Sequence, residues 1–203
     1  MDCSCYYKST AFFQKTLRCC RKFMFVFVTV LHYLCASETK EVSRFMAKIQ
    51  KTNVARLLDQ AKVPYELIPY EVDENDLSAP HVAESLGEDI AQVFKTLILQ
   101  GDRTGYFVCV IPGDATVDLK LAAKVSGNKK CEMIPMKQLL PLTGYIRGGC
   151  SPIGMKKHFP TYIHHTCEEF PYIFVSAGVR GLQLKIAPAD LLRMAQAEVA
   201  ELI

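Results

Sequence analysis

The eleven residues Gly144-Tyr145-Ile146-Arg147-Gly148-Gly149-Cys150-Ser151-Pro152-Ile153-Gly154 contain four glycines, one serine and one proline between two apolar segments. Glycine adopts positive φ values freely and lets backbone N–H groups approach a ligand closely. A loop of this composition can bind a carbonyl, carboxylate or phosphate group through main-chain donors. The same composition is typical of two tight turns between strands, so the loop alone does not decide between a binding site and a turn.

A second segment, Val93-Phe94-Lys95-Thr96-Leu97-Ile98-Leu99, predicts a buried β-strand because most of its residues are apolar. Side chains alternate between the two faces of a strand, which places Lys95 on the face of Val93 and Leu97. A lysine among apolar neighbours either extends to solvent at a strand end or points into a pocket. Next to a glycine-rich anion-binding loop, a lysine in a pocket predicts a binding site.

These two segments and four others resemble the YbaK/EbsC family of free-standing aminoacyl-tRNA deacylases. The family is related to the editing domain inserted in bacterial prolyl-tRNA synthetase. The matching segments, in the family's order and spacing, are residues 52–58, 70–73, 93–97, 118–120, 144–157 and 174–182. The ordered set is most similar to the Cys-tRNA(Pro) deacylase branch. The resemblance implies an α/β fold of the mixed α+β kind, in which helices surround a compact, strongly curved mixed β-sheet.

The resemblance also implies which residues form the site. Lys95 would hold the terminal ribose–phosphate region of a tRNA. Main-chain donors near Gly148 and Gly149 would orient the aminoacyl ester carbonyl and stabilise the charge that develops on it. In this branch the substrate's own thiol attacks its ester and releases a cysteine thiolactone, which is catalysis by proximity and orientation. The implied substrate-binding residues are Tyr70, Thr96, Ser151, Pro152, Ser176, Gly178 and Arg180.

Other functions stay open at this point. An Ala-tRNA(Pro) deacylase would use water on the same fold, and a binding protein would hold the tRNA end without turnover. A third possibility, a membrane-associated regulator, is suggested only by the apolar residues 23–35. Cys150 would be a nucleophile only if its thiolate were stabilised, and the resemblance does not require a cysteine there.

We expect neither a cofactor nor a metal ion. The four cysteines after residue 45 form no CxxC pair, and His164-His165-x-Cys167 is more simply a strand end or a loop. No GxGxxG or P-loop pattern is present, which disfavours a dinucleotide-binding or nucleotide-hydrolysing fold. Cysteines without pairing or zinc spacing predict a reduced, cytoplasmic domain.

Charge is concentrated in one part of the chain. Residues 1–45 hold 7 of the 24 basic and 3 of the 21 acidic residues, which leaves 17 against 18 in the remainder. Residues 120–157, however, contain eight basic residues and a single acidic residue, Glu132. A local basic stretch is typical of a nucleic-acid-binding surface and also of an ordinary solvated face. The residues that we expect to bind tRNA are Lys120, Lys124, Lys129, Lys130, Arg147, Lys156 and Lys157. The expected partners are the acceptor end of an aminoacyl-tRNA and, through the family resemblance, prolyl-tRNA synthetase.

Residues 1–45 differ in composition from the rest. They hold five of the nine cysteines and an apolar run, 23–31, behind Arg18, Arg21 and Lys22. A basic flank before such a run is typical of a signal peptide, but no clean cleavage site follows and the run is short for a membrane span. We interpret 1–45 as an extension upstream of the natural start or as a disordered segment, and 46–203 as the deacylase domain. A chain that starts at Met46 is expected to fold and to be active.

Helix and strand signals alternate without a repeated βαβ unit. Helices are expected after Thr52 or Asn53, from Ser78 to Gly87, from Asp118 to Ser126, shortly after Pro135, and from Pro188 to Leu202. Strands are expected at 65–70, 93–99, 106–111, 131–134, 172–176 and 182–187.

Overall fold

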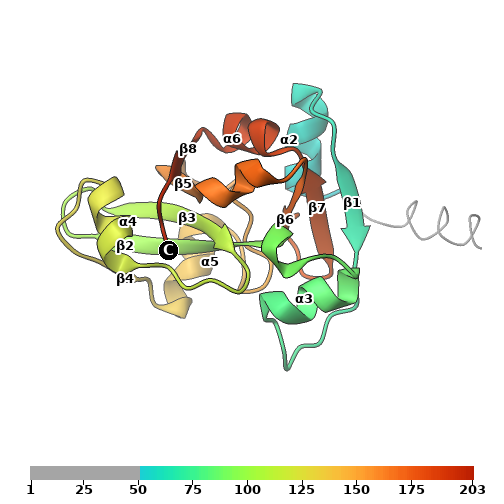
Figure 1. The fold of residues 1–203 in the computed structure, drawn as a ribbon, viewed down its shortest axis with the longest axis horizontal. Helices are drawn as coiled ribbons and strands as arrows, with labels where there is room; N and C mark the ends of the chain where they lie inside the picture. The colour runs from blue at the N-terminus through green and yellow to red at the C-terminus, as the bar shows by residue number, and fades with distance from the viewer. Residues whose placement is uncertain (1–50) are drawn as a thin grey trace, which may run out of the picture. The chain divides into compact units, whose positions relative to one another are not determined.

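The computed structural model describes residues 51–203, which form two β-sheets with helices packed around them (Figure 1). The interpretations of residues 1–45 and of Met46 as a natural start lie outside these residues. Among residues 51–203, every helix falls short of the length and apolar character that a membrane crossing requires.

The larger sheet has five strands of mixed direction. Along the sheet their order is β4 (Cys131–Met133), β2 (Phe94–Gly101), β3 (Tyr106–Pro112), β5 (Thr161–His164) and β8 (Ala197–Ala200). β2 runs antiparallel to both β3 and β4, whereas β3, β5 and β8 are parallel. β2 and β3 are therefore connected as a hairpin, whereas the parallel strands β5 and β8 each require a longer crossover connection.

The smaller sheet is antiparallel, with the strand order β1 (Glu66–Pro69), β7 (Leu182–Ile186) and β6 (Ile173–Ser176). A single parallel bridge between Val93 and Phe174 joins it to the start of β2. The strands are thus divided between two sheets that meet at one point, and together they confirm the expected mixed α+β fold.

Capping residues set the helix starts that the sequence predicts. Thr52 Oγ1 accepts a hydrogen bond from the Ala55 N–H at 3.2 Å, and Asp118 accepts from the N–H groups of Lys120 and Leu121. Ser78 caps the helix that begins at Ala79, and Gly87, with φ 67°, ends that helix. The helices are α2 (Asn53–Ala61), α3 (Ala79–Leu86), α4 (Leu119–Val125), α5 (Met136–Thr143) and α6 (Pro188–Ala195), with 3-10 turns η1 (Ile90–Gln92) and η2 (His165–Glu169). Such side-chain acceptors satisfy N–H groups that have no partner within the helix.

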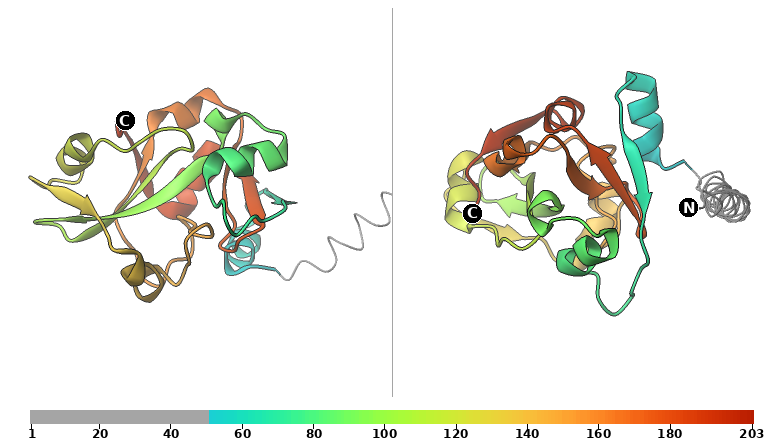
Figure 2. Two further views of the ribbon diagram at one scale, coloured as in Figure 1. Left: turned by 90° about the horizontal axis from the view of Figure 1, so that it is seen from below. Right: turned by 45° about the vertical axis from the view of Figure 1, so that its right-hand side comes forward.

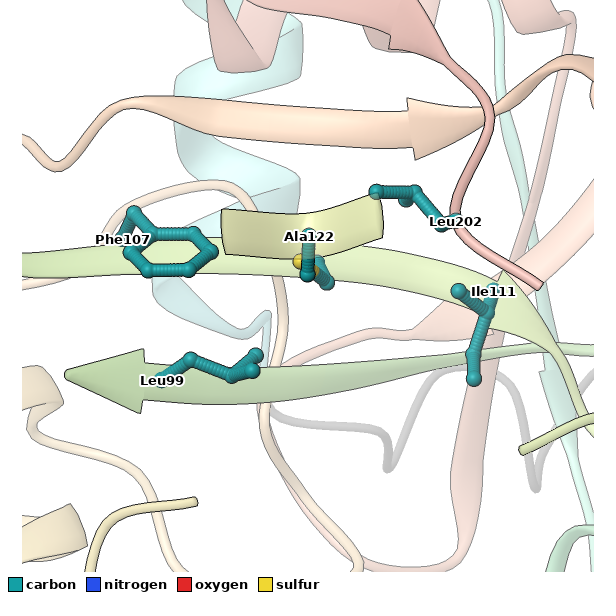
Figure 3. Close-up of a cluster of buried hydrophobic side chains, with 6 residues drawn as sticks. Leu99, Phe107, Ile111, Ala122 and Leu202 are labelled. Atoms are coloured by element: carbon teal, nitrogen blue, oxygen red, sulfur yellow. The ribbon is translucent and has the colours of Figure 1, made fainter. Parts of the chain in front are cut away.

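A buried cluster between α4 and the larger sheet forms the main core (Figure 3). Leu99 of β2, Phe107 and Ile111 of β3, and Ala122 of α4 meet there with Leu202, and all are fully buried. Figure 2 shows α4 and α5 on opposite faces of this sheet. The sheet face that α4 covers is therefore filled by core side chains, whereas the face on the α5 side is available for a site.

The predicted C-terminal helix from Pro188 to Leu202 is wrong beyond Ala195. Gln196 adopts a left-handed conformation with φ 49°, which ends α6, and residues 197–200 pair with β5 as the parallel strand β8. Neither β5 nor η2 was expected from the sequence. In the described sheet, β8 pairs only with β5. Because β5 was not expected, the helix predicted from the spacing of Leu191, Leu192 and Ala195 was extended beyond its true end.

The last residues of the chain test this packing. Leu202 is fully buried in the α4 cluster, and its backbone N–H donates to His164 Nδ1 at 3.2 Å. Leu202→Ala should lower the free energy of unfolding by about 2–5 kcal/mol, as a cavity in a core does. Ile203→Ala, at a residue that is 39% exposed, should change it by less than about 0.5 kcal/mol. Urea unfolding of both variants measures the difference, and equal losses would contradict the assigned core.

Candidate active site

A pocket of about 600 Å³ opens where the two sheets meet. One side of its wall is the segment from Leu77 to Pro80 at the start of α3, and another is Val93 with residues 94–98 of β2. The glycine-rich loop contributes Arg147, Gly148 and Cys150, and the smaller sheet contributes Ser176 and Gln183. Met133, Ile134, Met136 and Leu139 complete the wall. The structure therefore brings together the strand and the loop that the sequence singled out.

Lys95 lies in this wall and is only partly exposed. Its Nζ donates a hydrogen bond to the carbonyl of Gly113 at 2.8 Å. Burial lowers the pKa of Lys95, and the nearby Asp114 opposes that shift. An ammonium group has three donors, so the bond to Gly113 leaves two for a ligand. A partly desolvated ammonium with two free donors can hold a phosphate or ribose oxygen strongly.

The loop is rigidly held where it borders the pocket. Gly148 has φ 80°, a conformation that side chains with a Cβ rarely adopt. A Cβ on Gly149 would lie 3.2 Å from the backbone of Val179 and Arg180, and Arg180 Nε donates to the Arg147 carbonyl at 2.9 Å. The Gly149 N–H already donates to the Ile146 carbonyl at 3.0 Å. The N–H groups of Gly148 and Cys150, whose residues line the pocket, are therefore the better candidates for binding a carbonyl oxygen.

The pocket wall carries no activated nucleophile or base. Burial raises the pKa of the Cys150 thiol to about 12, so this thiol stays protonated at neutral pH. Among the described residues that line the pocket there is no histidine, aspartate or glutamate. A hydrolase that activates water or a side-chain nucleophile needs such a group within hydrogen-bond reach. The site is built to position a ligand and to bind charge.

Two polar atoms at the pocket have no partner within residues 51–203: Thr96 Oγ1 and Gln183 Oε1. Ser176 and Gln183 are directly opposite each other in neighbouring strands, so their side chains share a face. Buried polar atoms without a partner cost stability and are explained when a ligand supplies the missing bond. Gln183 was missed from the sequence, although a polar residue between Leu182 and Leu184 is the same signal that identified Lys95.

Gly149, which was predicted to be catalytic, and five of the predicted substrate-binding residues lie outside the wall. Tyr70 packs in an apolar cluster around Val82 and Phe174. Ser151 is fully buried, where its Oγ accepts a hydrogen bond from the Ile153 N–H at 3.4 Å. The others are Pro152, which is buried in the loop, Gly178 with φ 94°, and Arg180, which holds Arg147. Ser151 and Arg180 hold the backbone of the glycine-rich loop through hydrogen bonds, and Tyr70 belongs to a neighbouring apolar cluster.

The predicted tRNA-binding residues are all exposed, but they do not share one surface. Lys120 and Lys124 are on α4, and Lys129 and Lys130 lead from α4 into β4. Arg147 lines the pocket, with Lys156 and Lys157 later in the same loop region. Since α4 and α5 cover opposite faces of the larger sheet (Figure 2), the basic stretch of the sequence divides between the core face and the pocket face.

His164 and His165 lie away from the pocket, at the end of β5 and the start of η2. His164 Nδ1 accepts from the Leu202 N–H, and His165 Nδ1 lies 3.1 Å from Glu201 Oε2. Burial lowers the pKa of His164, which favours the neutral ring that this bond requires. These contacts explain the pair as an anchor for the end of the chain.

A family model described as an aminoacyl-tRNA editing domain matches residues 73–194, which include Lys95, the glycine-rich loop, Ser176 and Gln183. The chain belongs to the aminoacyl-tRNA editing domain family. It is 51% identical over 153 residues to the proposed Cys-tRNA(Pro)/Cys-tRNA(Cys) deacylase EbsC of Enterococcus faecalis, across 75% of this chain and 93% of that protein. The expected relationship to the YbaK/EbsC family is thereby confirmed.

The chain also has more distant relatives, one found by its sequence and one by its structure. YwhH of Bacillus subtilis, an uncharacterised protein, is 25% identical over 121 residues, which are 60% of this chain and 76% of that protein. The crystal structure of a proposed trans-editing enzyme for prolyl tRNA synthetase superposes with a TM-score of 0.64 at 21% identity, over 75% of this chain and 98% of that one. At this identity the superposition supports the fold alone.

The state of Cys150 is directly measurable. With a pKa of about 12, about one thiol in ten thousand is ionised at pH 8, so iodoacetamide should label Cys150 far more slowly in the folded editing domain than in urea. Mass spectrometry of the peptide that contains Cys150 measures both rates. Equal labelling rates in the folded and unfolded protein would show that the loop does not shield this thiol.

Proposed function

We propose that this editing domain acts in trans as an aminoacyl-tRNA deacylase that clears mischarged Cys-tRNA(Pro). The observation that carries the proposal is a pocket with a partly buried lysine and a glycine-rich loop but no histidine, carboxylate or ionised thiol in its wall. Such a site suits a substrate that brings its own nucleophile. The similarity to EbsC supports the same substrate.

The cysteine thiol of the substrate is that nucleophile. Its sulfur forms a bond to the ester carbonyl carbon, the bond from that carbon to the terminal ribose oxygen breaks, and the thiol proton ends on the ribose hydroxyl. The products are a cysteine thiolactone and a free tRNA end. The protein contributes orientation, which is worth several kcal/mol when reacting atoms are held in contact.

The residues of the pocket have distinct parts in this reaction. Lys95 uses its two free donors on the ribose–phosphate end of the tRNA. The N–H groups of Gly148 and Cys150 stabilise the negative charge on the carbonyl oxygen. Thr96, Ser176 and Gln183 offer oxygen acceptors to the amino group of the bound cysteine.

An editing function also fits the limits of amino-acid selection. Cysteine and proline are similar in size, and the fit of a small side chain in a pocket discriminates by only about 1–3 kcal/mol. A second site that destroys the wrong ester restores accuracy. Prolyl-tRNA synthetase is therefore a partner that would deliver the substrate, and the cytoplasm is the compartment in which both act. The four cysteines of the described residues are free, in keeping with a reducing compartment.

A comparison of three substrates tests the function. Cys-tRNA(Pro) should be deacylated much faster than Ser-tRNA(Pro), because a hydroxyl is a poorer nucleophile than a thiol at neutral pH. Ala-tRNA(Pro) has no nucleophile and should be the slowest. Release of the labelled amino acid measures all three rates. Faster turnover of Ala-tRNA(Pro) would instead support water as the nucleophile, and binding without turnover would support a tRNA-end-binding protein.

Lys95→Ala should reduce deacylation of Cys-tRNA(Pro) by at least about a hundredfold, since a charge-assisted contact to the tRNA end is lost within a desolvated site. Lys95→Arg should not restore the rate, because a planar guanidinium cannot occupy the place of a compact ammonium. Lys185→Ala is the matched control, since Lys185 is also partly buried but lies over the ring of Tyr172 outside the pocket. Equal activity of the Lys95 and Lys185 variants would overturn the role of Lys95.

A further inference from the structure

Two exposed segments that adjoin the pocket wall have opposite character. The first, which we call the acidic rim, consists of Glu71, Asp73, Glu74 and Asp76, all exposed, and leads directly into the wall at Leu77. Asp76 accepts a hydrogen bond from the Ser78 N–H at 2.9 Å, and its hydrogen bonds with Ser78 lower its pKa. This rim is therefore negatively charged at neutral pH.

The second, which we call the α5 rim, consists of Met133, Met136, Lys137 and Leu140. Met133 and Met136 belong to the pocket wall and yet are 46% and 57% exposed, while Leu140 is 51% exposed. The helix α5 contains no acidic residue, and Lys137 forms no ion pair within residues 51–203. Glu132 precedes Met133 in β4 and so points to the other face of that strand.

The proposed substrate has a constraint that a free ligand does not have. When the aminoacyl group and its ribose occupy the pocket, the attached RNA must leave through the mouth and cross one of the rims. RNA is a polyanion, and charges repel across the Debye length of about 8–10 Å at physiological salt. The acidic rim therefore disfavours the RNA, whereas Lys137 of the α5 rim, together with Arg147 of the glycine-rich loop, attracts its phosphates.

Exposed apolar side chains next to a basic residue suit unpaired bases. Bases have flat apolar faces that pack on neighbouring side chains, and methionine adapts its shape to varied apolar partners. Bases within a duplex are stacked on each other, so reaching their faces costs unstacking energy that unpaired bases do not require. An exposed apolar group that borders a pocket is also the expected form of a binding surface in a soluble domain.

We infer that the unpaired nucleotides next to the aminoacylated ribose lie on the α5 rim, with their bases on Met136 and Leu140 and a phosphate beside Lys137. The inference rests on the proposed function, since it takes the substrate to be an aminoacyl-tRNA. It narrows the basic residues that contact the RNA end to the pocket face. Lys120 and Lys124, on α4 across the sheet, take no part in this contact.

Binding of a stable substrate analogue tests the inference. The probe is an RNA hairpin with an unpaired 3′ end that carries cysteine through an amide, which the protein cannot cleave, and its blunt-ended counterpart is the comparison. Met136→Ser/Leu140→Ser should weaken binding of the unpaired probe on the order of tenfold and leave the blunt probe unchanged. Leu119→Ser, at a residue that is 41% exposed on α4, should change neither.

The salt dependence separates the two faces. Lys137→Gln should reduce the slope of log K against log salt by about 0.7, the value for one phosphate contact to a single strand. Lys124→Gln should leave the slope unchanged, and Glu74→Lys should tighten binding of both probes. Unchanged binding by the α5 variants would overturn the inference, as would equal slopes for the Lys137 and Lys124 variants.

The two proposals fail in different ways. The binding series uses only the amide-linked probe, so it reports on the α5 rim whether or not the protein cleaves an ester. If the wild-type protein releases no amino acid from Cys-tRNA(Pro) while the α5 variants bind the probe more weakly than wild type, the proposed function fails and the path of the RNA stands. If it releases the amino acid and the α5 variants bind the probe like wild type, only the path fails.

Discussion

The structure depends on the contact between Gly113 and the start of β2. The Gly113 N–H donates to the Val93 carbonyl at 2.7 Å, and its own carbonyl accepts from Lys95 Nζ at 2.8 Å. A Cβ at this position would lie 2.6 Å from that of Ala79 and 2.9 Å from Ile90 Cδ1. The end of β3, the start of α3 and Lys95 therefore meet at a residue that has room only for hydrogen. Because Val93 also bridges to Phe174, the same point joins the two sheets that form the pocket.

Under the proposed function, this arrangement explains how a pocket whose wall has no histidine or carboxylate can support catalysis. Lys95 donates a hydrogen bond to Gly113, and the loop packs at Gly149 against the backbone of Val179 and Arg180. Rigid donors that surround a bound ester gain transition-state stabilisation without reorganising when charge develops. In the proposed mechanism, the protein supplies geometry and charge, and the substrate's thiol is the nucleophile. Selectivity for cysteine then follows from the reaction itself as well as from the fit of the pocket.

The sequence predicted the local structure and the site where single residues carry a strong signal. Capping by Thr52, Ser78 and Asp118 marked three helices, and a charged residue within an apolar strand marked Lys95. The pairing of β5 with β8 could not be predicted, because four-residue strands are defined by distant neighbours and not by their own pattern. The division of the basic residues between two faces of a sheet could not be predicted either, because it depends on how segments distant in the sequence pack together. Tyr70 and Ser151 matched the family's motifs, but the structure places them behind the pocket wall.

The central claim is that the substrate's thiol, and not water or a protein group, attacks the ester. The most direct measurement compares Cys-tRNA(Pro) with its S-methylcysteinyl counterpart, in which the thiol is blocked and the ester is intact. The account predicts that the methylated substrate binds and inhibits but is not deacylated above the uncatalysed rate. Deacylation of the methylated substrate at a rate close to that of Cys-tRNA(Pro) would contradict it and require a water-activating group in this pocket.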